Sequence, residues 1–119
     1  MKRMRGLGPV AVFILLVGVG WAAAEGNPAR GRASYEHLCA LCHGTSGEGD
    51  GPAAASLSPK PTNLANKQYL NWLQDDYLKE LIKEGGLALG MSPLMPALGG
   101  ALNDDDVKNV ISYVRSLAK

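Results

Sequence analysis

The stretch Cys39-Ala40-Leu41-Cys42-His43 decides how this chain of 119 residues is interpreted. Its two cysteines are three positions apart, about one helical turn, so their sulfurs can reach two neighbouring points of a single bound group. The histidine that follows supplies an imidazole from the same side. The stretch therefore predicts a site at which two thiols and one imidazole hold a cofactor.

A C-x-x-C-H pattern is the attachment signature of c-type haem, with thioether bonds to two vinyl groups and the histidine on the iron. Three other interpretations were weighed. A thioredoxin-like pair lacks its βαβ context, and a zinc site lacks ligands because only His37 remains as a further Cys or His after residue 24. A plain disulfide gives His43 no role. We therefore expect one haem c per chain, bound through Cys39 and Cys42 and ligated by His43.

Residues 1–24 have the pattern of a secretory signal peptide. Positive charges come first, residues 7–21 are almost wholly apolar, and three alanines at 22–24 provide a cleavage site. The alternative is an uncleaved membrane anchor, although glycines and a proline interrupt the apolar stretch. The sequence predicts a periplasmic or secreted domain over residues 25–119, membrane-anchored only if the segment is retained.

The predicted domain is small and nearly neutral. Without residues 1–24 it has 95 residues, with nine Lys plus Arg against eleven Asp plus Glu. No basic stripe interleaved with aromatic residues is present, so we expect no nucleic-acid partner. A chain this short commonly needs a disulfide, metal or other staple to stabilise its core, and a buried cofactor would serve.

The local patterns predict helices and loops, and no strand. Asn27 and Pro28 indicate the start of a helix that runs to about residue 41. Residues 44–61 are rich in Gly, Ser and Pro, which predicts a long loop. A short helix is expected over 66–73, and a second over 77–84 with Asp75 or Asp76 as its cap.

Residues 87–102 hold two prolines and three glycines among leucines and methionines, which predicts an irregular, apolar loop. The last helix has the clearest signals. Asn103 and Asp106 form a capping-box-like pair. Apolar residues then recur with helical period, at Val107, Val110, Ile111, Val114 and Leu117.

With these motifs in place, residues 25–119 resemble the monohaem class I cytochromes c of the small bacterial type. The resemblance implies an all-α fold of three to four helices around one haem, with the first and last helices crossing. In that family a glycine and an aromatic residue before the attachment motif pack against the last helix. Gly31 and Tyr35 occupy those places here, and their partners would be Val110 and Tyr113.

The resemblance also implies the remaining contacts of the haem. A proline after the motif gives its carbonyl to the axial histidine, and Pro52 fits that position. The family's axial methionine directly precedes a proline, as Met95 precedes Pro96, so Met95 is the expected sixth ligand and Met91 is the alternative. The other methionine is expected to fill a gap in the core.

Trp72 and Tyr69 lie where family members often line the haem edge or bond its propionates. The other interpretation is an aromatic pair that packs beneath the second predicted loop, over residues 87–102. Neither residue is needed for the main prediction.

Iron held by both His and Met has no open position, so the resemblance implies a one-electron carrier and not an enzyme. Redox proteins, in the membrane or the periplasm, are its expected partners, and no small-molecule substrate is expected. Two alternatives remain. One is a haem protein with a weak or absent sixth ligand that binds small molecules or senses gas. The other is the electron-accepting cytochrome subunit of a periplasmic oxidoreductase.

Overall fold

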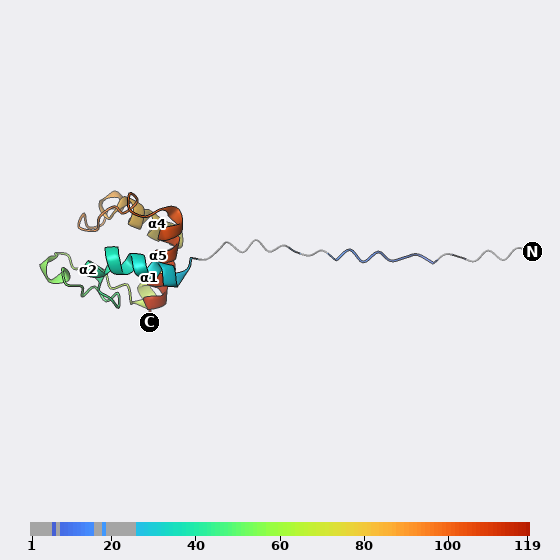
Figure 1. Cartoon of the computed structure of the whole chain (residues 1–119), viewed down its shortest axis with the longest axis horizontal. Helices are drawn as coiled ribbons and strands as arrows, with labels where there is room; N and C mark the ends of the chain where they lie inside the picture. The colour runs from blue at the N-terminus through green and yellow to red at the C-terminus, as the bar shows by residue number, and fades with distance from the viewer. Residues whose placement is uncertain (1–5, 7, 16–17, 19–25) are drawn as a thin grey trace, which may run out of the picture.

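The computed structural model describes residues 6, 8–15, 18 and 26–119, and the last of these ranges consists of helices joined by loops (Figure 1). Most of the predicted signal peptide, including the alanines at 22–24, lies outside the described residues. Residues 26–119 contain no strand. None of the helices described is long and apolar enough to cross a membrane. The predicted all-helical fold is confirmed.

Helix α1 (Pro28–Leu38) begins as predicted, because the Asn27 side chain accepts hydrogen bonds from the first free amides of the helix. The prediction that this helix continues to about residue 41 is wrong. It ends at Leu38, Cys39 is its C-cap, and a separate turn, α2 (Ala40–His43), follows. The carbonyls of residues 41–43 accept bonds of 2.8–3.1 Å from amides of the following loop. The motif turn is therefore fixed by that loop rather than by an extension of α1.

The middle of the chain forms η1 (Ala54–Ser56), α3 (Lys67–Trp72) and α4 (Asp75–Glu84). The cap predicted for α4 is wrong, because Gln74 occupies the N-cap and its side chain makes no capping bond. Asp75 and Asp76 lie one step further on, inside the first turn. There their charges still interact favourably with the positive end of the helix dipole.

Helix α5 (Asp104–Leu117) confirms its predicted start. The Asn103 side chain accepts from the Asp106 amide at 2.8 Å, and the Asp106 carboxylate accepts from the Asn103 amide at 3.1 Å. Residues 87–102, which we call the methionine loop, join α4 to α5. This loop is irregular as predicted, apart from the short turn η2 (Leu87–Leu89).

The core lies where α1 crosses α5. A Cβ atom at Gly31 would overlap the backbone carbonyl of Asn109, so the absence of a side chain allows the two helices to approach. The rings of Tyr35 and Tyr113 pack edge to face, with centroids 5.2 Å apart. The fully buried side chains are those of Tyr35, Leu70, Val107 and Val110. The predicted helix crossing is confirmed.

Two segments extend from the same side of this crossing in the view of Figure 1. One is α2 with the green loop that follows it, and the other is the orange methionine loop beyond α4. The residues that the sequence predicts as ligands lie on these two segments. The crossing therefore acts as the base from which both halves of the site are presented.

Candidate functional site

The three motif residues lie together on and beside α2, and all three are half-buried. The two cysteines form no disulfide bond. The Cys42 amide bonds the Cys39 carbonyl at 3.2 Å, and the His43 amide bonds the same carbonyl at 2.9 Å. Burial and the neighbouring Cys42 raise the pKa of the Cys39 thiol to about 11. The motif thus presents two thiols and an imidazole from one helical turn.

The imidazole of His43 is held in one tautomer. Its Nδ1 lies 3.0 Å from the carbonyl oxygen of Thr62. A carbonyl only accepts, so Nδ1 carries the hydrogen and Nε2 keeps a free lone pair. Burial lowers the pKa of His43, with the bond to Thr62 opposing this shift. Burial therefore favours the neutral form of the ring, which is the form that binds a metal.

The carbonyl partner of His43 corrects the prediction of Pro52. After the motif the chain turns back on α2, with the Gly51 amide bonding the Cys42 carbonyl at 3.1 Å and the Ala53 amide bonding the Leu41 carbonyl at 2.9 Å. This turn leaves Pro52 exposed. The carbonyl that accepts from His43 Nδ1 belongs to Thr62, ten positions after Pro52.

Thr62 is the site residue that the sequence analysis missed. Its segment returns to the motif because the Leu64 amide bonds the Gly47 carbonyl at 2.6 Å. The one signal available was Pro61, which stiffens the backbone just before Thr62. That signal could not be separated from those of Pro52 and Pro59, because all three lie in the same loop.

The methionine loop holds the two sulfur candidates in different settings. Met91 is 36% exposed, and its Sδ accepts a hydrogen bond from the Tyr77 hydroxyl at 3.1 Å. Met95 is half-buried, and its backbone carbonyl accepts from the Gly86 amide at 3.0 Å. The Met91 thioether is therefore engaged by α4, whereas the Met95 backbone is anchored and its thioether has no hydrogen bond among the described residues.

Trp72 of α3 does not pack beneath a loop. The Trp72 side chain is 81% exposed and that of Tyr69 is 36% exposed. The second interpretation of this pair is therefore wrong for Trp72. The role of Trp72 at a haem edge stays a prediction.

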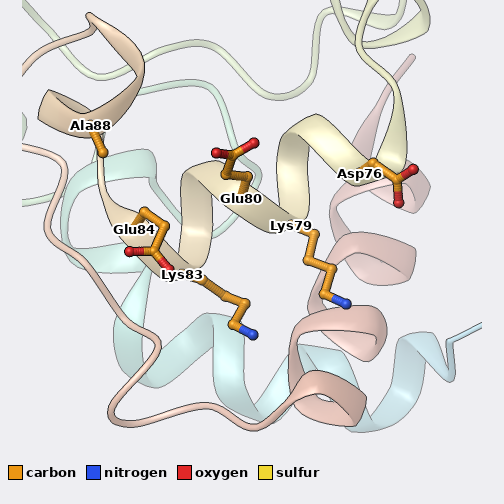
Figure 2. Close-up of a pocket in the computed structure, with 6 residues that line it drawn as sticks. All are labelled: Asp76, Lys79, Glu80, Lys83, Glu84 and Ala88. Atoms are coloured by element: carbon orange, nitrogen blue, oxygen red, sulfur yellow. The ribbon is translucent and has the colours of Figure 1, made fainter.

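The open hollow on α4 is not the cofactor site. Its lining consists of Ala88 and charged side chains of α4. Figure 2 shows Lys79 and Lys83 extending to one side of α4 and Glu80 to the other. Both lysines pair with Asp104 at the start of α5, at 3.9 and 2.6 Å. No sulfur or imidazole lines this hollow, and its two lysines belong to the junction of α4 and α5.

A large apolar cofactor fits the surfaces that flank the ligand candidates. On the motif side, Leu38 and Leu41 are 38% and 60% exposed. On the methionine-loop side, Leu87, Met91 and Leu94 are 36–73% exposed. Large apolar side chains are favoured in the interior, and here they gather beside the thiols, the imidazole and the thioethers. The donor set and its apolar surroundings suit a haem.

Comparison with known proteins decides the family. The family model for cytochrome c matches residues 28–118, which is most of the chain. The chain belongs to the cytochrome c family. It is accordingly a haem c and iron-binding protein of electron transport, and its two cysteines stand as in the family's attachment motif.

Two relatives of this cytochrome are matched over most of their own length. Cytochrome c-554(547) of Halothiobacillus neapolitanus is 28% identical over 94 residues, which is 77% of this chain and 98% of the relative. The cytochrome c subunit of 4-cresol dehydrogenase (hydroxylating) of Pseudomonas putida is 28% identical over 117 residues. That match covers 98% of this chain and 86% of the relative.

Another relative is much longer than this cytochrome. The CcoP subunit of the cbb3-type cytochrome c oxidase of Azospirillum sp. (strain B510) is 30% identical over 98 residues. The match covers 82% of this chain but 31% of that subunit. This cytochrome thus spans about a third of the oxidase subunit that it matches.

Solved structures share the fold. The c-type cytochrome KustC0563 superposes with a TM-score of 0.61 at 24% identity, covering 75% of this chain and 98% of that one. A chain of the reducing HAO-like protein complex of Kuenenia stuttgartiensis gives a TM-score of 0.60 at 22% identity, covering 80% of this chain and 44% of that one. Both confirm the class I cytochrome c fold.

Proposed function

We propose that this cytochrome is a one-electron carrier whose haem c is bound through Cys39 and Cys42 and ligated by His43 and Met95. When bound, the haem supplies an iron that cycles between its ferrous and ferric states. Cys39 and Cys42 would hold the group covalently through two thioethers, and His43 and Met95 would each give the iron one ligand. With both positions filled by the protein, transfer of an electron is the chemistry that remains.

The hydrogen bond between His43 Nδ1 and the Thr62 carbonyl supports the role of His43. It orients the ring, fixes the tautomer and makes Nε2 a better donor to a metal. The apolar surroundings disfavour the extra charge of the ferric state, which raises the reduction potential. His43 therefore serves as a rigid ligand in a poorly hydrated setting.

The observation that carries the proposal is the contrast between the two methionines. The Met91 sulfur accepts a hydrogen bond from Tyr77, whereas Met95 has its backbone anchored beside Pro96 and its thioether available. A soft thioether ligand favours ferrous iron and raises the potential further. We therefore assign Met95 as the sixth ligand, and we assign Met91 to the contact with α4.

The experiment is a set of absorption spectra of the purified holoprotein in both redox states, with CO added to the reduced form. Met95→Ala is compared with Met91→Ala, which removes the neighbouring thioether from the same loop. We expect Met95→Ala to lose the low-spin His/Met spectrum and to bind CO readily. The wild type and Met91→Ala should keep the spectrum and bind CO poorly.

Persistence of the low-spin His/Met spectrum in Met95→Ala would refute Met95 as the ligand. Ready binding of CO by the wild type would favour a haem protein with an open iron, which binds small molecules or senses gas. These two outcomes distinguish a wrong ligand from a wrong class of function.

We further propose that the carrier works outside the cytoplasm with redox proteins as partners, and that it has no small-molecule substrate of its own. The predicted signal peptide supports this location. The retention of residues 1–24 as an anchor would place the domain at the membrane. An N-terminal sequence of the mature protein tests this, because cleavage after residue 24 gives a chain that begins at Glu25.

A second candidate is the electron-accepting subunit of an oxidoreductase. The dehydrogenase subunit of Pseudomonas putida supports it, since that relative aligns over 98% of this chain. Isolation of the tagged cytochrome under native conditions separates the two candidates. A stoichiometric oxidoreductase partner would favour the subunit, and recovery of the cytochrome alone would favour a free carrier.

A further inference from the structure

Gly86 and the last turn of α4 hold the methionine loop at Met95 and at the residues that follow it. The Gly86 amide, just beyond the helix, donates to the Met95 carbonyl at 3.0 Å. The Ile82 carbonyl of α4 accepts from the Leu98 amide at 2.9 Å, and the Lys83 carbonyl accepts from the Gly99 amide at 3.1 Å. Any shift of α4 would therefore move the loop and the Met95 sulfur with it.

Polar contacts fasten the C-terminal end of α4 to α5. The Lys83 ammonium lies 2.6 Å from one oxygen of Asp104, and the Lys79 ammonium lies 3.9 Å from the other. Figure 2 shows the two lysines extending in the same direction from α4. Lys83 thus binds the methionine loop through its carbonyl and the first turn of α5 through its side chain.

A single arginine fastens the N-terminal end of α4. Nε of Arg115, in the last turn of α5, donates to the Asp75 carboxylate at 2.7 Å. Its two terminal nitrogens donate to the carbonyls of Leu70 and Leu73 at 2.9 and 2.6 Å. These carbonyls belong to the end of α3, so one planar guanidinium joins the ends of three helices.

Side-chain packing alone holds α4 weakly. Leu78 is its only buried residue, whereas Tyr77, Leu81 and Ile82 remain half-buried. The α1 and α5 crossing, in contrast, buries most of the core. The directed polar contacts at the two ends of α4 therefore add to this limited packing in fixing its place on α5.

We propose that Arg115 and Lys83 are positioning residues for the sixth ligand: they hold α4 on α5 and thereby keep the Met95 sulfur at the iron. This inference rests on the proposed ligation by Met95. Neither side chain touches the cofactor in this scheme, and their effect passes through α4 and the hydrogen-bonded loop. Loosening either end should let the thioether leave the iron more often.

The test compares Arg115→Met with Arg32→Met in the holoprotein. Arg32 is a matched control, because its Nε also binds a carboxylate at 2.7 Å, that of Glu36, but on the outer face of α1. The measured quantities are the rate of CO binding to the reduced protein and the reduction potential. We expect Arg115→Met to raise the CO rate about tenfold, the effect of losing a charge-assisted hydrogen bond, and to lower the potential. Arg32→Met should match the wild type.

Two further variants keep the test decisive. Arg115→Lys keeps the positive charge but loses the planar set of guanidinium N–H donors. We therefore expect a CO rate between those of the wild type and Arg115→Met. If Arg115→Met fails to fold, Lys83→Met at the other end of α4 provides the same test with a smaller rise. CO rates and potentials equal to those of Arg32→Met in every folded variant would overturn the inference.

Met95→Ala, measured alongside, separates this inference from the proposed function. If Met95→Ala raises the CO rate and the positioning variants do not, the inference alone is wrong. If Met95→Ala also leaves the CO rate unchanged, the ligand assignment is wrong and the inference is overturned with it.

Discussion

The α1 and α5 crossing and the methionine loop are held by different forces. At the crossing, side chains interlock: Gly31 allows the approach of the two backbones, and the rings of Tyr35 and Tyr113 meet at 5.2 Å. The methionine loop is held by backbone hydrogen bonds to the end of α4, and much of its apolar surface is exposed. The crossing therefore determines stability, whereas the loop determines the setting of the proposed ligand, Met95.

This difference indicates whether a substitution should change the folding free energy or the surroundings of the iron. Dense packing transmits a change of one methyl group as a loss of folding free energy. A loop held at its ends can shift with a modest loss of stability and a large change at the iron. The following variants break or sharpen this contrast.

The largest effect is expected for Gly31→Ala. The added Cβ overlaps the Asn109 carbonyl, so the two helices must move apart. We expect a loss of about 3 kcal/mol or more in the free energy of unfolding, measured with urea. Gly100→Ala is the control, because a Cβ there meets no atom within 4 Å. Equal stability of the two variants would contradict the close approach of α1 and α5.

An intermediate effect is expected for Gly85→Ala. Gly85 has φ 82° and ψ 170°, a conformation open essentially to glycine, and a Cβ there lies 3.1 Å from the Met95 carbonyl oxygen. We expect a loss of about 1–3 kcal/mol in unfolding free energy, together with faster CO binding to the reduced protein.

Gly90→Ala is the matched control for Gly85→Ala. Gly90 also has a positive φ, 70°, but a Cβ there meets open space. The control should lose stability through backbone strain and keep the CO rate of the wild type. The same rise in CO rate for both variants would mean that strain anywhere in this region, and not displacement of the Met95 segment, frees the iron.

The smallest effect is expected for Tyr35→Phe, which tests the link between the crossing and the motif. The buried Tyr35 hydroxyl donates to the Gly44 carbonyl at 2.7 Å, next to His43. We expect a loss of about 1 kcal/mol in unfolding free energy. Tyr113→Phe is the control, because its hydroxyl makes no hydrogen bond among the described residues, and it should lose less.

The effect of Tyr35→Phe should depend on pH. Burial raises the pKa of Tyr35 above its ordinary value of 10.0. Between pH 10 and the raised pKa, the phenol is ionised in the unfolded chain but not in the folded protein. The contribution of Tyr35 to the unfolding free energy is therefore complete below pH 10 and declines above it. The stability difference between wild type and variant should therefore narrow above pH 10. A difference that widens there would contradict the assigned bond.

The parts of the fold that could be predicted are those with local causes. The caps at Asn27 and Asn103 act within one turn, and the period of Val107, Val110 and Val114 marks the buried face of α5. The family resemblance added the partners of Gly31 and Tyr35. Each of these signals lies on the segment that it describes.

The parts that failed have non-local causes. The partner of His43 depends on where a long loop returns, so the sequence predicts Pro52 although the structure has Thr62 there. The break at Cys39 depends on loop amides that bond to the motif turn. The bond from Tyr77 to Met91 and the contacts of Arg115 join residues 14 and 40–45 positions apart, and no sequence pattern marks such pairs.

The crossing has one more consequence, because it brings together the first and last helices, α1 and α5. The Asn27 amide bonds the Asn109 side chain at 2.7 Å across 82 positions of sequence. A protease cut at the exposed Gly90 would leave one fragment with Cys39, Cys42 and His43 and another with Met95 and α5. The fragments would remain joined through the crossing, so the second would supply the proposed ligand, Met95, to the iron in trans. The colour of the haem would then report whether the fragments are associated.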